Sequence, residues 1–161
     1  MTIIYDLDHT IIDSSHRQLT KPDGTLDLEN WVENCTREKI LADTLLPLAD
    51  SWLAHLDSGE NPEIVVCTAR VMGTWDYTFL GNNGLFATAI LSRPEGCILG
   101  DADLKEFLLR QYAMTTNRTW ARFANGSTMY DDNIAVLTRC ETLGICVKDA
   151  VLLNQKWERT A

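Results

Sequence analysis

Several features that define other classes of protein are scarce or missing in this sequence. Its five cysteines include no CxxC pair and have no histidine at metal-ligand spacing, so neither a disulfide framework nor a zinc site is expected. We expect these thiols to be reduced and to pack as small apolar side chains. No apolar run approaches the roughly 18 residues of a membrane span, and the chain starts in a strand-like run rather than a signal segment. The sequence therefore predicts a cytoplasmic protein without membrane contact.

Basic residues are also few. The chain has 14 Lys and Arg against 23 Asp and Glu, which gives a formal net charge of -9. This charge opposes general attraction to a polyphosphate backbone, so any contact with nucleic acid must be local. A GxxxxGK[ST] phosphate-binding loop is missing as well, which excludes an attached kinase activity.

The composition that remains is typical of an ordinary folded domain. Hydrophobic residues make up 45% and charged residues 23% of the 161 positions, close to the averages of soluble globular proteins. The chain has no internal repeat and no low-complexity tract. We therefore expect residues 1–161 to form a single domain, and nothing in the sequence predicts a stable protein partner.

Five short apolar runs recur along the chain, and segments of helical periodicity separate them. The runs that we interpret as buried strands are 2–5, 64–67, 87–91, 127–130 and 145–147. Helical faces are predicted after Pro47, after Asp103 as a cap, and from Ile134 to Cys140. This alternation predicts an α/β fold, a Rossmann-like, doubly wound and mainly parallel sheet, with its ligand at the carboxyl ends of the strands.

A polar stretch at 13–30 is the one long irregular segment. A loop of this length in a small domain is more often functional than idle, so we interpret it as a flap, with a plain surface excursion as the alternative. Only about 57 residues separate Thr10 from Thr68, which leaves no room for a large cap domain. The site is therefore expected to be open.

Two carboxylates, Asp6 and Asp8, follow directly after the first predicted strand. One carboxylate in that place can attack phosphorus, while the second protonates the leaving group and then activates water. A solvated turn is the alternative interpretation of such a pair.

A second acidic pair, Asp131 and Asp132, follows the fourth predicted strand. Carboxylates from two strand ends, with no excess of Lys or Arg to neutralise them, suit a hard cation such as Mg²⁺. The alternative is that one of the two merely caps the next helix.

Groups that could hold phosphoryl oxygens stand near the same strand ends. Thr68 and Arg70 end the second predicted strand, Arg93 lies just beyond the third, and Lys105 follows in the next helix. Arg is suited to bidentate phosphate recognition, and Lys105 could offset the acidic charge, with an exposed lysine without a role as the alternative.

These residues resemble, in order, the four motifs of the haloacid dehalogenase superfamily of phosphotransferases. The motifs are DLDHT at 6–10, VVCTAR ending at Arg70, Lys105, and YDDN at 130–133. The resemblance implies a Rossmann-like sheet, Mg²⁺, Asp6 as the nucleophile and Asp8 as the general acid and base. It also implies that Thr68 and Lys105 hold the phosphoryl group, and that the metal is bound by Asp6, by the backbone carbonyl of Asp8, and by Asp132 with its neighbour Asp131.

Within the superfamily, the layout is most similar to the polynucleotide 3'-phosphatase branch, which removes 3'-phosphates. The leading hypothesis is therefore an Mg²⁺-dependent phosphomonoesterase that acts on the 3'-phosphate of a nucleic-acid end, with Arg17, Arg70 and Arg93 as a local basic ring around the cleft. A nucleotidase or small-molecule phosphatase with the same chemistry is the alternative, favoured by the net charge of -9. A third hypothesis is a non-catalytic binding module. Trp75, His9 and His16 stand near the predicted cleft without an assigned role.

Overall fold

Strand β1 (Thr2–Tyr5) lies at the centre of a five-stranded sheet, and all four of its residues are buried. The computed structural model describes residues 1–159 and gives the strand order β5-β4-β1-β6-β7, with every neighbouring pair parallel. The other strands of this sheet are β4 (Glu63–Thr68), β5 (Ala89–Ser92), β6 (Ser127–Asp131) and β7 (Cys146–Asp149). All five predicted strands are thus present, with ends that shift by at most two residues. The predicted α/β fold class is confirmed.

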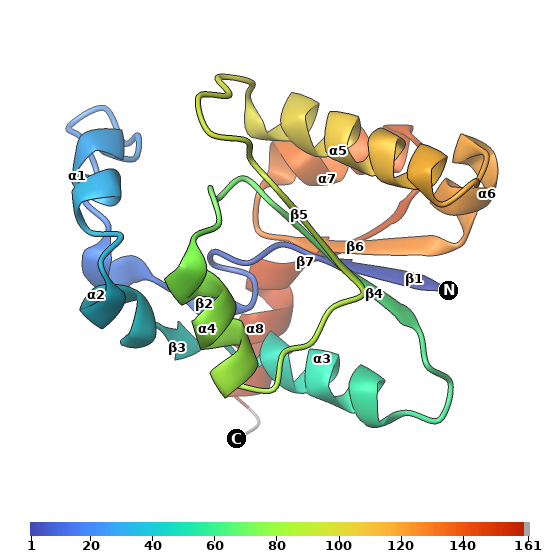
Figure 1. Cartoon of the computed structure of the whole chain (residues 1–161), viewed down its shortest axis with the longest axis horizontal. Coiled ribbons are helices and arrows are strands. Elements are labelled where there is room, and N and C mark those ends of the chain that lie inside the picture. Colours follow the sequence, from blue (N-terminus) through green and yellow to red (C-terminus); the bar gives the residue numbers. More distant parts are fainter. Residues whose placement is uncertain (160–161) are drawn as a thin grey trace.

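Helices cover both faces of this sheet (Figure 1). Apolar residues of one face pack against α3 (Leu48–Asp57), α4 (Thr74–Asn82) and α8 (Ala150–Glu158). Those of the other face pack against α5 (Asp101–Thr115), α6 (Trp120–Asn125) and α7 (Ile134–Thr142). Successive residues of β1 therefore serve two cores: Tyr5 stacks on Trp52 of α3 with ring centroids 5.2 Å apart, whereas Ile4 belongs to the opposite core.

The helix after Pro47 begins as predicted, but the predicted cap at Asp103 is wrong. Helix α5 starts at Asp101 after the extended residue Gly100, so Asp103 lies inside the first turn, where the helix dipole favours a carboxylate. The cysteines also differ in part from the prediction. All five thiols are free, but Cys35 and Cys146 are exposed while Cys67 and Cys140 are buried.

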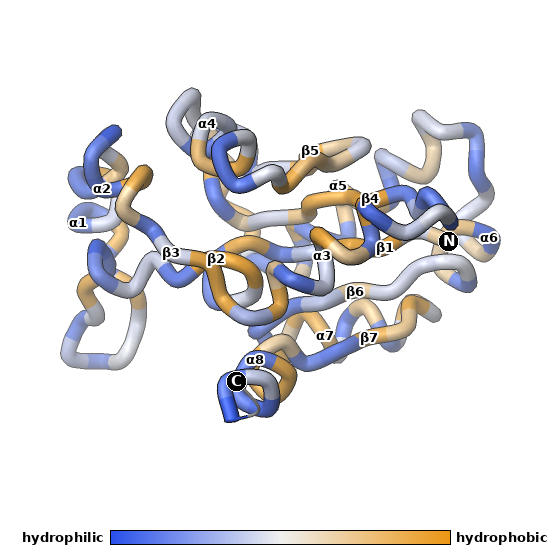
Figure 2. The backbone as a smooth tube through the Cα atoms, turned by 90° about the horizontal axis from the view of Figure 1, so that it is seen from below, coloured by the Kyte–Doolittle hydropathy of each residue, from blue (hydrophilic) through white to orange (hydrophobic). Residues whose placement is uncertain are grey.

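The predicted flap at 13–30 forms part of an arm at one end of the molecule (Figures 1 and 2). The arm contains β2 (Ile12–Asp13), a 3-10 turn (Ser15–Arg17), α1 (Leu28–Glu33), α2 (Arg37–Leu41) and β3 (Thr44–Leu45). Strands β2 and β3 pair antiparallel as a separate two-stranded sheet. Within the described residues, this arm contains two short α-helices and no large cap domain. Within residues 1–159, no helix has the length and apolar character needed to cross a membrane.

Candidate active site

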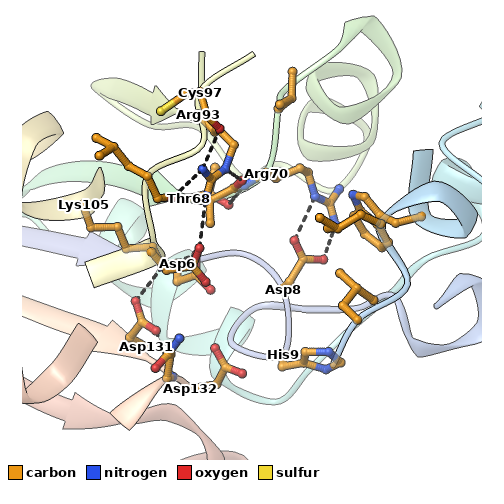
Figure 3. A pocket seen from close by; sticks show the side chains of 18 of the residues that line it. Asp6, Asp8, His9, Thr68, Arg70, Arg93, Cys97, Lys105, Asp131 and Asp132 are labelled. Carbon is orange, nitrogen blue, oxygen red and sulfur yellow. Dashed lines mark hydrogen bonds and ion pairs between the residues drawn. The ribbon is translucent and has the colours of Figure 1, made fainter. Parts of the chain in front are cut away.

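An acidic cluster lies where the two central strands end. Asp6 follows β1, Asp131 is the last residue of β6, and Asp132 comes next. One carboxylate oxygen from each of the three lies within 4.8 Å of the others, and Figure 3 shows the side chains side by side. Strands β1 and β6 are parallel neighbours, so their carboxyl ends bring the two sequence motifs together. Carboxylate oxygens at this spacing are the donor set that Mg²⁺ prefers.

Lys105 of α5 points into this cluster from the adjacent helix. Its Nζ lies 2.8 Å from a carboxylate oxygen of Asp6 and donates a hydrogen bond of 2.7 Å to Asp131. Lys105 is buried, and these two carboxylates raise the pKa of the ammonium group although burial alone would lower it. The structure thus places the ammonium group of Lys105 between two of the three carboxylates.

One ammonium does not neutralise three carboxylates. Burial, followed by repulsion from Asp131, raises the pKa of Asp6 to about 7 even though Lys105 acts in the opposite sense. Burial and the charge of Asp6 likewise raise the pKa of Asp132 to about 6. The excess of negative charge in a buried place fits the binding of a divalent cation.

The turn that follows β1 directs Asp8 away from this cluster. The amides of Ile11 and Ile12 both donate to the carbonyl of Leu7, and His9 has a left-handed backbone with φ of 55°. Such a conformation is uncommon outside glycine and is typical of tight turns at functional sites. Asp6 and Asp8 consequently face different partners.

Arg70, two residues beyond the end of β4, binds the Asp8 carboxylate with two hydrogen bonds of 2.6 and 3.1 Å (Figure 3). Ser14 adds a third at 2.6 Å. Burial on its own would raise the pKa of Asp8, but Arg70 and then Ser14 outweigh it and hold that pKa below its usual value. Asp8 is therefore held as a carboxylate, ready to accept a proton.

Arg70 is itself fixed by acidic residues that the sequence analysis did not single out. Its guanidinium donates a hydrogen bond of 2.6 Å to the carboxylate of Asp76 and lies 3.7 Å from a carboxylate oxygen of Asp43. The Asp76 carboxylate also accepts a hydrogen bond of 2.8 Å from the backbone amide of Gly73, just before α4. The start of α4 therefore fixes Asp76, and Asp76 in turn fixes Arg70. Thr68, buried at the end of β4, accepts from the backbone amide of Arg70.

The predicted basic ring of three arginines does not form. Arg17 is buried and donates hydrogen bonds of 2.8 and 2.9 Å to the carboxylate of Asp43. Its guanidinium therefore does not line the cleft. Arg93 does line the cleft, but it binds the carbonyl of Ala69 at 2.8 Å and the carboxylate of Asp101 at 2.8 Å. In both cases the guanidinium binds acceptors of this chain: Arg17 binds Asp43, which is 26 residues away in the sequence, and Arg93 binds Ala69 and Asp101. Substrate contact by Arg70 and Arg93 stays a prediction.

Replacement of Asp43 by Ala is expected to destabilise the fold by about 3–5 kcal/mol, because it leaves the buried guanidinium of Arg17 without its partner. Urea unfolding followed by circular dichroism measures this loss. Arg110→Ala, which removes an exposed pair with Glu106, is the control and should change stability far less. Equal effects of the two variants would contradict a structural role for the Arg17–Asp43 pair.

One continuous cavity of about 800 Å³ joins these groups to the surface. Its inner part is polar and contains the acidic cluster, Asp8, Thr68 and Lys105. Its outer part includes Trp31 of α1, whose ring lies under the guanidinium of Arg17 at 4.2 Å. Trp75, whose ring centroid lies 5.0 Å from the guanidinium of Arg37, is exposed and does not line the cavity.

The other two residues without an assigned role bind polar neighbours. His9 lines the cavity and makes a hydrogen bond of 3.1 Å with Gln18. His16 binds the buried Asp43 at 2.9 Å.

Comparison with known proteins adds a family and a fold. Residues 1–159 match the family described as bacteriophage T5 5'-deoxynucleotidase. The 5'-deoxynucleotidase of Escherichia phage T5 is 40% identical over 166 residues, which cover 94% of this chain and 68% of that protein. This relative is described as a nucleotidase and not as a polynucleotide 3'-phosphatase.

Two solved structures share the fold at low sequence identity. A haloacid dehalogenase-like family protein, SP0104 from Streptococcus pneumoniae, is 15% identical with a TM-score of 0.63, covering 96% of this chain and 90% of that one. A chain of the Pnkp1/Rnl/Hen1 RNA repair complex is also 15% identical with a TM-score of 0.63, covering 92% of this chain and 41% of that one. The haloacid dehalogenase-like fold that the motifs implied is thus confirmed.

Proposed function

The chain belongs to the bacteriophage T5 5'-deoxynucleotidase family, and from this premise we propose that it removes the phosphate from deoxynucleoside 5'-monophosphates. This proposal replaces the leading sequence-based hypothesis, a 3'-phosphatase of nucleic-acid ends, with its nucleotidase alternative. The relative at 40% identity is the reason for preferring the nucleotidase, because the motifs for phosphoryl transfer are common to both activities and do not distinguish them.

The charge of the cavity supports a small substrate. The cationic side chains that line it are Arg70, Arg93 and Lys105, and each pairs with carboxylates of this chain. Within residues 1–159, no unpaired guanidinium or ammonium group is left on its walls to track further phosphates of a polymer. A mononucleotide, with one phosphate, needs none.

The first half of the reaction uses the inner end of the cavity. An oxygen of Asp6 attacks phosphorus to form an aspartyl phosphate, and the bond between phosphorus and the 5'-oxygen of the nucleotide breaks. Lys105, 2.8 Å from Asp6, is placed to stabilise the negative charge of the phosphoryl oxygens, and Thr68 lines the same end. The leaving 5'-oxygen takes a proton from Asp8, which must bind that proton before this step because its hydrogen bonds favour the carboxylate.

The second half regenerates the enzyme. Asp8, as a carboxylate, accepts a proton from water while the water oxygen attacks the aspartyl phosphate, and inorganic phosphate leaves with Asp6 restored. The hydrogen bonds from Arg70 and Ser14 favour this base form. The same residue thus gives a proton and takes one back, so the cycle is balanced.

Magnesium fits the donor set that the described residues offer. Asp6, Asp131 and Asp132 would hold it, and with the ion bound it would neutralise the phosphoryl oxygens and the attacking carboxylate. All of Asp6, Asp8 and the acidic pair are present, as a catalytic enzyme requires and a non-catalytic module does not.

Replacement of Arg70 by Gln is expected to move the acidic limb of the pH profile of kcat toward higher pH, because kcat includes the hydrolysis of the aspartyl phosphate, in which Asp8 acts as a base. Arg70 holds the pKa of Asp8 down, so its removal raises that pKa, and Asp8 then loses its base form at a higher pH than in the wild type. Rates on a deoxynucleoside 5'-monophosphate between pH 4 and 9 measure the shift. Arg110→Gln is the control, and an unmoved limb in the Arg70 variant would contradict the pairing of Arg70 with a catalytic Asp8.

The proposed function itself is tested by phosphate release from deoxynucleoside 5'-monophosphates with Mg²⁺. Activity well above that on 3'-monophosphates supports it. Activity confined to 3'-phosphates would restore the 3'-phosphatase hypothesis.

A further inference from the structure

Exposed apolar side chains gather at the outer part of the cavity. Sixteen large hydrophobic residues of the described chain are exposed, and six of them line this one cavity. These six are Leu26, Leu28, Val32, Val71, Ile98 and Leu99. Single exposed apolar residues are ordinary, but a group that lines one cavity marks a binding surface.

Two of these residues are the most exposed of the six. Ile98 is 98% exposed and Val32 is 71% exposed. They come from distant parts of the chain: Val32 lies on α1, and Ile98 lies in the loop between β5 and α5 (Figure 1). Neither side chain contributes to the two cores of the fold. Their apolar surface is therefore available to a ligand in the cavity.

We propose that this outer apolar part of the cavity binds the nucleobase of the substrate, with Val32 and Ile98 as residues that favour a substrate with a base over one without. The inference rests on the proposed nucleotidase function, which places the substrate phosphate beside Asp6 and Lys105. From that end the sugar and base extend along the cavity, and the apolar side chains line the remainder. The volume of about 800 Å³ lies within the range of small-molecule sites.

The chemistry of these walls suits a base better than further phosphates. Trp31 lines the same cavity and is held by the guanidinium groups of Arg17 and Arg70, at 4.2 and 5.6 Å from its ring centroid. Aromatic and aliphatic surface binds the face of a base, which all bases share, rather than the hydrogen-bonding edge that distinguishes them. An apolar site of this kind favours the presence of a base strongly and discriminates among bases only modestly.

The test compares ligands with and without a base in a form that cannot turn over. On an Asp6→Asn background, calorimetry measures the Kd of deoxyadenosine 5'-monophosphate and of 2-deoxyribose 5-phosphate. The nucleotide should bind at least about tenfold more tightly, the scale expected for covering one or two apolar side chains. Adding Val32→Ser and Ile98→Ser should remove most of this ratio and leave the Kd of the sugar phosphate within about twofold.

A matched control uses Met114→Ser, which removes an exposed apolar side chain at the end of α5, outside the cavity. Circular dichroism and urea unfolding check that each variant is folded. We expect the fold to persist because both substituted positions are exposed. Equal weakening of the binding of both ligands by the double variant would overturn the inference. An unchanged ratio of the two Kd values would also overturn it and would favour a partner protein as the ligand of this surface.

Failure of the proposed function gives a different result. A wild-type protein that releases no phosphate from any deoxynucleoside 5'-monophosphate would contradict the nucleotidase proposal. The binding ratio would still report whether the apolar walls hold a base, because it does not depend on turnover.

Discussion

Replacement of Asp6 by Asn should lower kcat on deoxynucleoside 5'-monophosphates by at least about 10³-fold, because an amide cannot attack phosphorus. The change is nearly isosteric, and Lys105 keeps its partner Asp131 at 2.7 Å, so the fold should persist. Phosphate release and circular dichroism, measured on the same preparation, separate the loss of chemistry from a loss of structure.

The matched control for this variant is Asp57→Asn, an exposed carboxylate at the end of α3 and outside the cavity. It should retain wild-type kcat. More than a few per cent of wild-type kcat in a folded Asp6→Asn protein, against the roughly 0.1% that a 10³-fold loss leaves, would contradict Asp6 as the nucleophile.

Removal of divalent metal is expected to abolish activity, and added Mg²⁺ to restore it. Without a cation the carboxylates of Asp6, Asp131 and Asp132 crowd one another and repel the phosphate dianion, since Lys105 supplies only one positive charge. Dialysis against EDTA followed by a Mg²⁺ titration measures the dependence. Ca²⁺ should inhibit, because a larger ion accepts more oxygen ligands and changes the alignment of Asp6 with phosphorus.

The control for the metal experiment is Asp132→Asn, which should weaken the response to Mg²⁺ by removing one of the three carboxylates. Full wild-type activity after exhaustive chelation would contradict the acidic cluster as a metal site, as would zinc at stoichiometric occupancy in elemental analysis.

The positions of the strands and of the acidic pairs could be read from the sequence because both depend on local order. A buried parallel strand is a short apolar run, and whatever follows it lies at the carboxyl edge of the sheet. Asp6 and Asp131 therefore meet in the structure, as the spacing of the motifs predicted. Lys105 was less certain, because only the packing of α5 decides whether its side chain points into the cluster or toward solvent.

The environment of the arginines could not be predicted in the same way. Arg17 was assigned to the cleft, but its partner Asp43 lies 26 residues further along the chain. Asp43 stands in an apolar run, LADTLL, and a buried acid there gives only a weak signal of a buried ion pair. Asp76 gives none, since a carboxylate in the first turn of a helix is ordinary. Long-range pairing of this kind depends on how the arm folds against the sheet.

The motifs could not decide between the two candidate substrates, for a related reason. The catalytic motifs concern the phosphoryl group, which the substrates of 3'-phosphatases and nucleotidases share, whereas we propose that the rest of the substrate contacts the outer cavity. That region is built from Val32 of α1 and Ile98 of the loop before α5, which carry no motif. The motifs carry no information on the sugar and base, so the nucleotidase proposal depends on the match to the family.

The most direct test of the account is a ranking of kcat/KM under identical Mg²⁺ conditions. The substrates are a deoxynucleoside 5'-monophosphate, its 3'-monophosphate isomer, and oligonucleotides that carry a terminal 5'- or 3'-phosphate. We predict that the 5'-mononucleotide exceeds each of the others by at least about tenfold, because only it places one phosphate at Asp6 and its base at the apolar walls. A higher kcat/KM for the 3'-phosphorylated oligonucleotide would contradict the nucleotidase account.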